Sequence, residues 1–319
     1  MNLSICIVID PLETLKPTMD TSLLIAGECH DRGHKVYVTT GNSLFFFRDT
    51  TWATVQEFCF KRNLTYTSIM EFAKENTTLP LSNFDIVLMR TDPPVNPKYF
   101  GFTYLLDYAN TLVLNSPSIL RNVTEKSLVL RWPDYTPTCA MSVNPENLID
   151  IVKKDSDVIW VAKPANNFNG NAVFKISAKE LKNAISAIQI CTNNGTELAI
   201  LQEFLPEVVE GDKKIFMIGK EIVGAMNRLP IDDDFRANIH LGAKSEKTVL
   251  TKRERHICET VGAYCDSIGA PITCIDMIGE QLTEINITSP SGIPEINKVE
   301  KSHFEEVIVD YLEKYVSQN

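Results

Sequence analysis

Short apolar segments alternate with a segment of helical spacing over the first 115 residues of this chain. Continuous apolar runs are typical of parallel strands that are buried on both faces, and strand–helix–strand alternation gives right-handed crossovers. The sequence therefore predicts an α/β, doubly wound parallel sheet, with function at the carboxyl ends of its strands, where Asp10 and Arg90 lie. We expect strands at residues 3–9, 35–39, 84–89 and 112–114, and a helix at 21–32.

Paired strand signals around short polar turns replace this alternation after residue 117. Residues 228–247 form a long polar stretch without a clear element, which is typical of a functional lid loop, and the Asn-rich residues 165–171 are a second candidate. We expect strand pairs at 157–164 with 172–176, 213–218 with 221–225 and 273–278 with 282–287, a further strand at 198–203, and helices at 178–191, 252–268 and 305–316.

Charge and cysteine content limit the class of partner. Lys and Arg number 31 and Asp and Glu 41, for a net charge of −10, so the surface repels nucleic acid and anionic membranes on average. No apolar stretch has the length of a membrane span, and no secretory signal is visible. The eight cysteines form no CxxC pair. We therefore expect a cytoplasmic protein with free thiols and no nucleic-acid or membrane partner.

The last predicted strand pair carries the polar pattern with the most chemical content. Glu284 and Asn286 are two residues apart and share one face of a strand, and a turn at residues 279–281 would place Asp276 opposite Glu284. Two carboxylates and an amide oxygen are ligands that suit Mg²⁺ in contact with phosphate oxygens. The alternative is an ordinary solvated face of an antiparallel pair, and the pattern alone leaves both interpretations open.

Three further features fit a nucleotide site without proving one. Lys163 ends a strand, Lys126 follows the Asn115 turn, and residues 202–205 place polar beside apolar side chains at a strand end. Each also fits a solvated surface lysine or the end of a core strand. The GxGxxG and GxxxxGK[ST] motifs are absent, so neither a standard dinucleotide site nor a P-loop is expected. No HExxH or Cys/His cluster indicates zinc.

Taken in order along the chain, these motifs resemble prokaryotic-type glutathione synthetase of the ATP-grasp superfamily. The most specific run is Leu282-Thr-Glu-Ile-Asn-Ile-Thr-Ser-Pro290. The other residues that carry the resemblance are 9–11, 87–94, 115–122, 125–126, 163–164, 202–206, 211–213, 228–230, Arg236 and 275–279.

The resemblance implies three domains: an N-terminal substrate-binding α/β domain at 1–123, an ATP-grasp lid at 124–200 and a C-terminal ATP-grasp antiparallel-sheet catalytic domain at 201–319. It implies an ATP-dependent ligase that joins γ-glutamylcysteine and glycine through an acyl phosphate. ATP would be the co-substrate, Mg²⁺ or Mn²⁺ the cofactor, and the assembly a homo-oligomer.

The resemblance also implies roles for single residues. Phosphoryl transfer depends on positioning and charge neutralisation, which fits sites rich in cations and metal ligands. The implied roles are catalysis for Arg228 and Arg236; ATP binding for Lys126, Lys163, Gln202, Glu203, Phe204, Leu205 and Asp212; substrate binding for Arg90, Lys214 and Ser289; and metal binding for Asp276, Glu284 and Asn286.

The chain departs from the family pattern around the phosphates and the substrate carboxylates. Residues 166–171 hold only Gly170 where the family is glycine-rich, and Lys214 and Pro294 stand where the family usually has arginine. Residues 232–234 and 243–244, in the lid candidate at 228–247, also differ. Two alternative hypotheses follow: a related ATP-grasp carboxylate–amine ligase with another acyl donor or amine, or a non-catalytic nucleotide-binding homologue.

Overall fold

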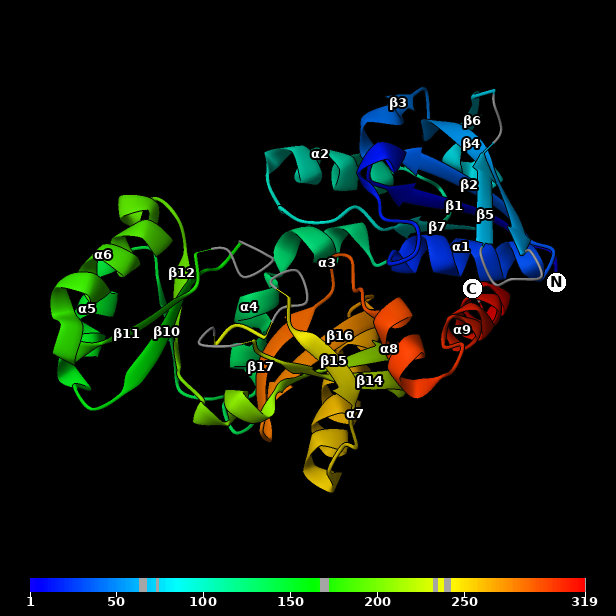
Figure 1. Ribbon diagram of the computed structural model, residues 1–319. Helices are drawn as coiled ribbons and strands as arrows, with labels where there is room; N and C mark the ends of the chain where they lie inside the picture. Colours follow the sequence, from blue (N-terminus) through cyan, green and yellow to red (C-terminus); the bar gives the residue numbers. More distant parts are fainter. Residues whose placement is uncertain (63–67, 73–74, 167–171, 232–234, 238–241, 319) are drawn as a thin grey trace.

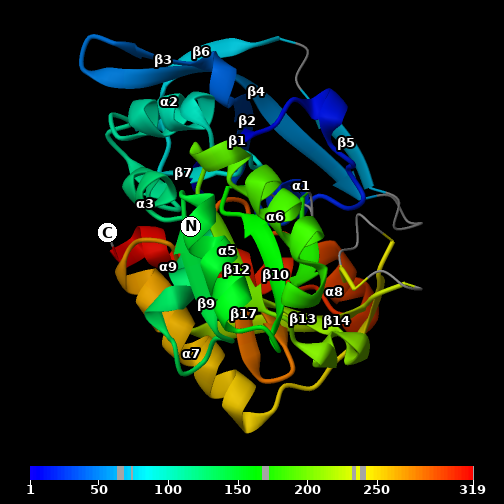
Figure 2. The same ribbon diagram turned by 90° about the vertical axis from the view of Figure 1, so that its left-hand side faces the viewer.

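A computed structural model describes residues 1–62, 68–72, 75–166, 172–231, 235–237 and 242–318. Three sheets organise the chain (Figures 1 and 2). We call them the N-terminal, middle and C-terminal sheets, in the order of their first strands. The molecule is mixed α/β, as the sequence predicts.

Parallel strands form the centre of the N-terminal sheet. The strand order is β2-β1-β7-β8, and each neighbouring pair is parallel. This confirms the parallel sheet expected from the apolar runs. The bounds are β1 Ser4–Ile9, β2 Lys35–Thr40, β7 Ile86–Met89 and β8 Leu112–Leu114.

Helices cover both faces of this sheet, so it is doubly wound. Ile5 and Ile7 of β1 belong to the buried cluster that includes Leu23 of α1 (Thr21–Asp31). Cys6 belongs to the cluster on the other face, which includes Tyr99 of α2 (Pro97–Leu106). Asp20 caps the start of α1, because its side chain accepts a hydrogen bond from Leu23 N at 2.8 Å.

The segment of the chain that follows β2 and precedes β7 forms an antiparallel ribbon, which extends the N-terminal sheet. The sequence patterns gave no prediction for this segment. The long strand β4 pairs with β2, β3, β5 and β6, always antiparallel. Apart from the short apolar run Leu44–Phe47, polar and aromatic residues are mixed in this segment, so no clean alternation is present. The bounds are β3 Leu44–Phe47, β4 Thr50–Arg62, β5 Ser68–Phe72 and β6 Thr77–Pro80.

The middle sheet is antiparallel, with the order β11-β10-β12-β9. It contains the predicted pair at 157–164 and 172–176, and two helices pack on it through Val152, Trp160 and Ile188. The helix expected from residue 178 begins at Leu181, after a short 3₁₀ turn. The bounds are β9 Cys139–Ser142, β10 Ile159–Pro164, β11 Phe174–Ser177, β12 Ala199–Glu203, α5 Pro145–Lys154 and α6 Leu181–Cys191.

The C-terminal sheet is also antiparallel, with the order β15-β14-β13-β16-β17. The loop is shorter than the lid predicted over residues 228–247. The first residues of that range belong to β14 and the last to β15, and these two strands pair. The bounds are β13 Asp212–Ile218, β14 Glu221–Leu229, β15 Lys244–Lys247, β16 Ile272–Ile278, β17 Gln281–Asn286, α7 Lys252–Ser267, α8 Ile293–Glu300 and α9 Glu305–Gln318, with α3 Pro117–Asn122 and α4 Glu125–Leu128 before the middle sheet.

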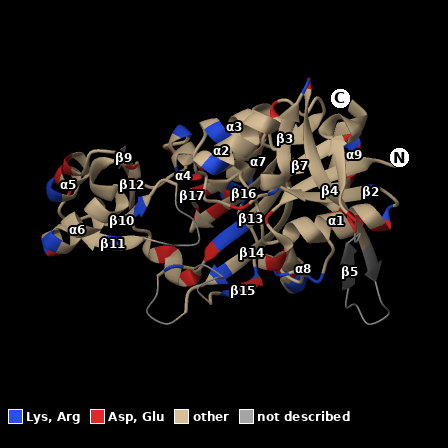
Figure 3. Ribbon diagram, turned by 90° about the horizontal axis from the view of Figure 1, so that it is seen from above, with Lys and Arg blue, Asp and Glu red and all other residues tan. Residues whose placement is uncertain are grey.

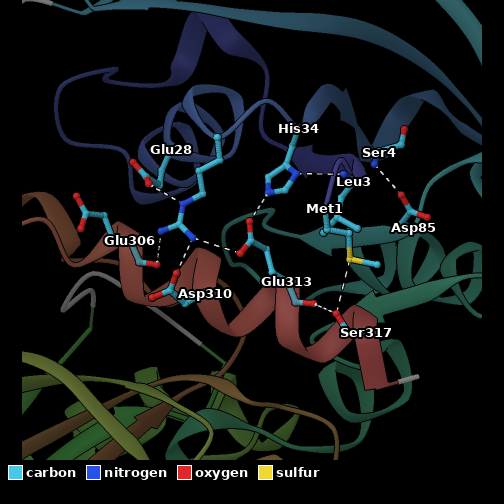
Figure 4. Close-up of polar contacts among 11 residues, drawn as sticks. Met1, Leu3, Ser4, Glu28, His34, Asp85, Glu306, Asp310, Glu313 and Ser317 are labelled. Atoms are coloured by element: carbon cyan, nitrogen blue, oxygen red, sulfur yellow. Dashed lines mark hydrogen bonds and ion pairs between the residues drawn. The ribbon is translucent and has the colours of Figure 1, made fainter.

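The last helix, α9, holds the C-terminal part of the chain against the N-terminal part (Figure 4). Arg32 donates to Glu28 at 2.8 Å and also reaches Asp310 and the carbonyl oxygen of Glu306. The buried His34 ring accepts from Leu3 N at 3.0 Å and meets Glu313 at 2.8 Å. Hydrogen bonds from Arg32 and His34 therefore join α1 and the residue before β1 to α9, and those to the carboxylates are charge-assisted.

Replacement of Arg32 by alanine is expected to lower the free energy of unfolding by about 1–2 kcal/mol, because Glu28 is largely buried and loses its cation. Thermal unfolding followed by circular dichroism measures the effect. The exposed Arg255 of α7 offers a matched control, Arg255→Ala, which is expected to unfold like the parent. Equal melting temperatures for all three proteins would mean that this contact contributes nothing to stability.

Within the described residues, no helix is long and apolar enough to cross a membrane. All eight cysteines are free, and six of them are buried.

Candidate active site

The middle and C-terminal sheets and loops of the N-terminal part line one cavity of about 470 Å³. Lys163 and Gln202 reach it from the middle sheet, and Asp276 and Glu284 reach it from the C-terminal sheet. The N-terminal part adds residues of the segment before α1 and Asp92 after β7, at the carboxyl end of its parallel strands. A cavity with polar groups from several elements has the character of a ligand site.

The β16–β17 hairpin has the predicted register, with Asp276 opposite Glu284 and Cys274 opposite Asn286. The turn is shorter than expected, because Ile278 pairs with Gln281. A register shift after Asp276 compensates, and Thr283 Oγ1 donates to the Asp276 carbonyl oxygen at 3.0 Å. All three predicted metal-binding side chains line the cavity.

Two cations from other strands of the same sheet lie beside Asp276. Arg228 Nη2 lies 3.0 Å from one of its oxygens, and Lys214 Nζ lies 3.4 Å from the other. Burial alone would raise the pKa of Asp276, but these two cations outweigh it and hold the pKa below its usual range. Figure 3 shows the basic positions of β13 beside acidic positions of the same sheet.

Asp212 shares Arg228 with Asp276, at 2.7 Å from Nη2. Burial and the Asp276 charge raise the pKa of Asp212, against the attraction of Arg228. The pKa of Lys214 is raised because Asp276 outweighs the effect of burial. Two carboxylates and two cations, all largely buried, are thus held together, and charges interact more strongly there than at the surface.

Two lysines from different elements enter the cavity near Glu284. Lys126 of α4 lies 3.6 Å from Glu284 Oε1, and Lys163 of β10 donates to Gln202 Oε1 at 3.0 Å. Both lysines are more than nine-tenths buried, unlike ordinary surface lysines. Burial lowers the pKa of Lys163, and the Glu284 charge partly opposes this. Buried cations in a cavity are suited to a polyanionic ligand.

The end of β12 provides one wall of the cavity. Glu203 N donates to Thr138 O and Phe204 N to Ile159 O, both at 2.8 Å, so the backbone is fixed there. Glu203, Phe204 and Leu205 all line the cavity. This wall combines apolar surface with polar backbone, which is what a flat nucleobase requires.

Arg90 does not line the cavity but lies behind it. Its guanidinium is buried, donates to Ser22 Oγ at 3.0 Å and to Pro290 O at 2.6 Å, and has a pKa lowered by burial. Ser289, which does line the cavity, donates to the Arg90 carbonyl oxygen at 3.2 Å. The arrangement lets Arg90 position the Ser289–Pro290 segment. Its predicted contact with substrate stays a prediction.

Arg236 lines the cavity together with Phe235 and Ala237. Residues 232–234 and 238–241 on either side lie outside the described residues, as does most of the second predicted lid at 165–171. Phe235 contacts Phe204 with ring centroids 5.9 Å apart, so this short segment lies against the wall formed by the end of β12.

Several residues line the cavity to which we assigned no role from the sequence. Glu125 accepts hydrogen bonds from Ile287 N and Thr288 N, both at 2.8 Å, and burial raises its pKa. Asp20, Asp92 and Glu295 also line the cavity. Acidic residues are common on surfaces, so spacing alone could not single these out. Glu125 is adjacent to Lys126, which was the one available signal.

The oxygen donors present fit a divalent cation. Within the described part of the chain, no three Asp, Glu, His or Cys residues form a metal-binding group, so two carboxylates need a further oxygen ligand. Asn286 supplies an amide on the same face of the hairpin, and its buried Nδ2 has no hydrogen-bond partner among the described residues. Because no hydrogen bond from the described residues holds the amide nitrogen, the amide can turn its oxygen toward a cation.

Two family models match nearly the whole chain. "Prokaryotic glutathione synthetase, N-terminal domain" matches residues 3–121, and "Prokaryotic glutathione synthetase, ATP-grasp domain" matches residues 125–301. Glutathione synthetase of Gloeobacter violaceus is 36% identical over 321 aligned positions, covering 98% of this chain and 97% of that protein. Glutathione synthetase of a Nostoc species is 32% identical, covering 98% of each chain.

Solved structures show the same fold at much lower sequence identity. D-cycloserine synthetase DcsG superposes with a TM-score of 0.68 at 12% identity, covering 97% of this chain and all of that one. D-alanyl-alanine synthetase A of Vibrio cholerae superposes with a TM-score of 0.61 at 13% identity, covering both chains fully.

Proposed function

The chain belongs to the prokaryotic glutathione synthetase family and is an ATP-dependent carbon–nitrogen ligase that forms glutathione, and we propose that the cavity between its sheets is the active site. The single observation that carries this proposal is the convergence of Lys126, Lys163, Asp276 and Glu284 in that cavity. Buried cations beside buried carboxylates are the groups that a triphosphate and its metal ion require.

The nucleotide end of the site would be the wall at the end of β12. The backbone of residues 203–205 would contact the adenine, and Lys163 and Lys126 would bind the phosphates. Both lysines are held by neutral or acidic neighbours, Gln202 and Glu284, at 3.0 and 3.6 Å. A phosphate oxygen can replace these contacts without exposing either cation to water, so little reorganisation is needed on binding.

The enzyme uses a divalent metal ion along with ATP, as its family does, and we assign the metal-binding role to Asp276, Glu284 and Asn286. Hard oxygen donors favour Mg²⁺, with Mn²⁺ as a substitute. When bound, the ion would neutralise charge on the phosphates. Asp276 is well prepared for this role, because its lowered pKa keeps it ionised.

The acyl-donor end of the site would lie toward Lys214, Arg228, Arg236 and Ser289. Activation of a carboxylate by ATP gives an acyl phosphate, in which phosphate replaces hydroxide as leaving group. The amine of glycine can then form the peptide bond with release of phosphate. Arg228 is fixed by two carboxylates, Asp212 and Asp276, so its guanidinium is oriented before any substrate arrives. Asp212, to which the resemblance assigns ATP binding, would thus also position Arg228 at the acyl-donor end.

Incubation with ATP, Mg²⁺, γ-glutamylcysteine and glycine tests the function. The expected products are glutathione, ADP and phosphate in equal amounts, measured by chromatography and a phosphate assay. ADP without glutathione would indicate another acceptor or donor, and a panel of dipeptides and amines in the same assay would identify it. The absence of both products would contradict catalysis and favour a nucleotide-binding protein.

Two further features of the enzyme are proposed, its cellular location and its oligomeric state. We expect a cytoplasmic location, because all eight thiols are free and catalysis consumes a thiol dipeptide. We also expect a homo-oligomer.

A further inference from the structure

Residues 287–292 join β17 to α8 and belong to neither element, yet several of them line the active-site cavity. Asn286 at the end of β17 and Ser289 within the segment are the cavity residues to which we assign metal and substrate binding. A segment outside strands and helices has no regular ladder of backbone hydrogen bonds, so other groups must satisfy and hold its polar atoms. Whatever holds this segment therefore determines where the Asn286 and Ser289 side chains lie.

Side chains from distant parts of the chain hold the segment on both sides of Thr288. The buried Asn115, directly after β8, donates from Nδ2 to Ile287 O at 2.7 Å. Arg90, directly after β7, donates to Pro290 O at 2.6 Å. The path of the segment is thus fixed by the N-terminal part of the chain and not by its own sheet.

Glu125, the first residue of α4, holds the middle of the segment. Its Oε1 accepts hydrogen bonds from Ile287 N and from Thr288 N, both at 2.8 Å. Both donors belong to buried residues. Because two consecutive amides converge on one oxygen, the peptide plane between them cannot rotate without breaking a bond. Figure 1 shows α4 beside β17, which is the arrangement that brings the carboxylate to these amides.

The acceptor oxygen of Glu125 matters here more than its charge. Burial raises the pKa of Glu125 and the Glu284 charge raises it further, while the bond from Thr288 N opposes them. A negative charge is therefore unfavourable at this position. Glutamine offers an acceptor oxygen with the same reach and no charge, whereas aspartate keeps the charge on a side chain that is one methylene shorter.

We propose that Glu125 is a positioning residue, which holds the amides of Ile287 and Thr288 and thereby places Asn286 and Ser289 for the metal ion and the acyl donor. The inference rests on the proposed function of the cavity. Glu125 also lines the cavity itself. The experiment must therefore separate action through the segment from direct contact of the carboxylate with a ligand.

Glu125→Gln and Glu125→Asp make that separation in the full-length enzyme. For Glu125→Asp, KM for γ-glutamylcysteine is expected to rise about tenfold and kcat to fall about tenfold, because the shorter side chain does not reach both amides. Glu125→Gln should stay within about twofold of the parent in both constants. Glu146→Asp, at an exposed position in the first turn of α5 outside the cavity, is the matched control and should equal the parent.

Calorimetric titration supplies a measurement that does not depend on turnover. Binding of γ-glutamylcysteine to enzyme that holds Mg²⁺ and a non-hydrolysable ATP analogue should weaken about tenfold in Glu125→Asp only. An impaired Glu125→Gln beside a parent-like Glu125→Asp would show a direct role of the charge and overturn the proposal. A Glu125→Asp variant with a lowered melting temperature but parent KM and Kd would also overturn it, because the contact would then only stabilise the fold.

Lys163→Met separates failure of this proposal from failure of the cavity assignment. That variant is expected to lose binding of the ATP analogue in the same titrations, because its amine lies in the cavity and not in the segment. Parent-like nucleotide binding by Lys163→Met would contradict the cavity assignment and this proposal together. Impaired Lys163→Met with parent-like Glu125→Asp would contradict the positioning role alone.

Discussion

Replacement of Glu284 by glutamine is expected to lower kcat by about 100-fold or more while the fold is retained. The change keeps the size of the side chain but removes one of two carboxylate charges from the oxygen donors that we assign to the metal ion. A loss of about 3 kcal/mol of transition-state stabilisation corresponds to such a factor. Glu284 also lies 3.6 Å from Lys126, so the same variant removes a negative charge beside a lysine that we assign to the phosphates.

A glutamate in the turn of the same hairpin is the matched control. Glu280 is exposed and does not line the cavity, and it accepts a hydrogen bond from Thr251 Oγ1 that glutamine can also accept. Glu280→Gln should therefore retain parent kcat. Steady-state rates of ADP release, at saturating Mg²⁺ and substrates, compare the three proteins. A Glu284→Gln rate within a few-fold of the parent would remove Glu284 from the metal site.

Replacement of Lys163 by methionine is expected to abolish stabilisation by ATP and to lower kcat/KM for ATP by about 100-fold. Without nucleotide the melting temperature should change little, because two effects offset each other. Methionine removes an amine whose pKa burial has lowered, which favours the variant. It also leaves the buried Gln202 Oε1 without its donor, which disfavours it.

Loss of the ATP effect with an unchanged melting temperature without nucleotide would identify a lysine that binds ligand and does not stabilise the fold. The control is Lys182→Met on α6, the helix that packs on the middle sheet, because Lys182 is exposed and lies outside the cavity. Thermal unfolding with and without Mg²⁺ and a non-hydrolysable ATP analogue is the measurement. A parent-like shift in Lys163→Met would show that this amine does not bind the nucleotide, whatever the effect on stability.

The sequence was sufficient to predict those parts of the site that depend on local pairing. Apolar runs and short turns placed the parallel strands and the β16–β17 pair, and strand periodicity brought Asp276 opposite Glu284. The turn between them was misjudged by one residue. The error had no consequence, because the register shift after Asp276 restores the offset.

Long-range packing was not predictable from one sequence. The ion pairs of Arg228 with Asp212 and Asp276 join strands that pair only in the folded sheet, and hydrogen bonds to Glu125 come from residues 162 and 163 positions away. The segment of β3–β6 lacks a clean period, so its strands were missed altogether.

Anomalous diffraction from Mn²⁺, in crystals grown with a non-hydrolysable ATP analogue, locates the metal ion and the nucleotide together. We expect manganese within about 2.0–2.3 Å of Asp276, Glu284 or Asn286 oxygens and of the analogue's phosphates, with Lys126 and Lys163 on the same phosphates. Manganese away from this hairpin, or a nucleotide bound outside the cavity, would contradict this expectation.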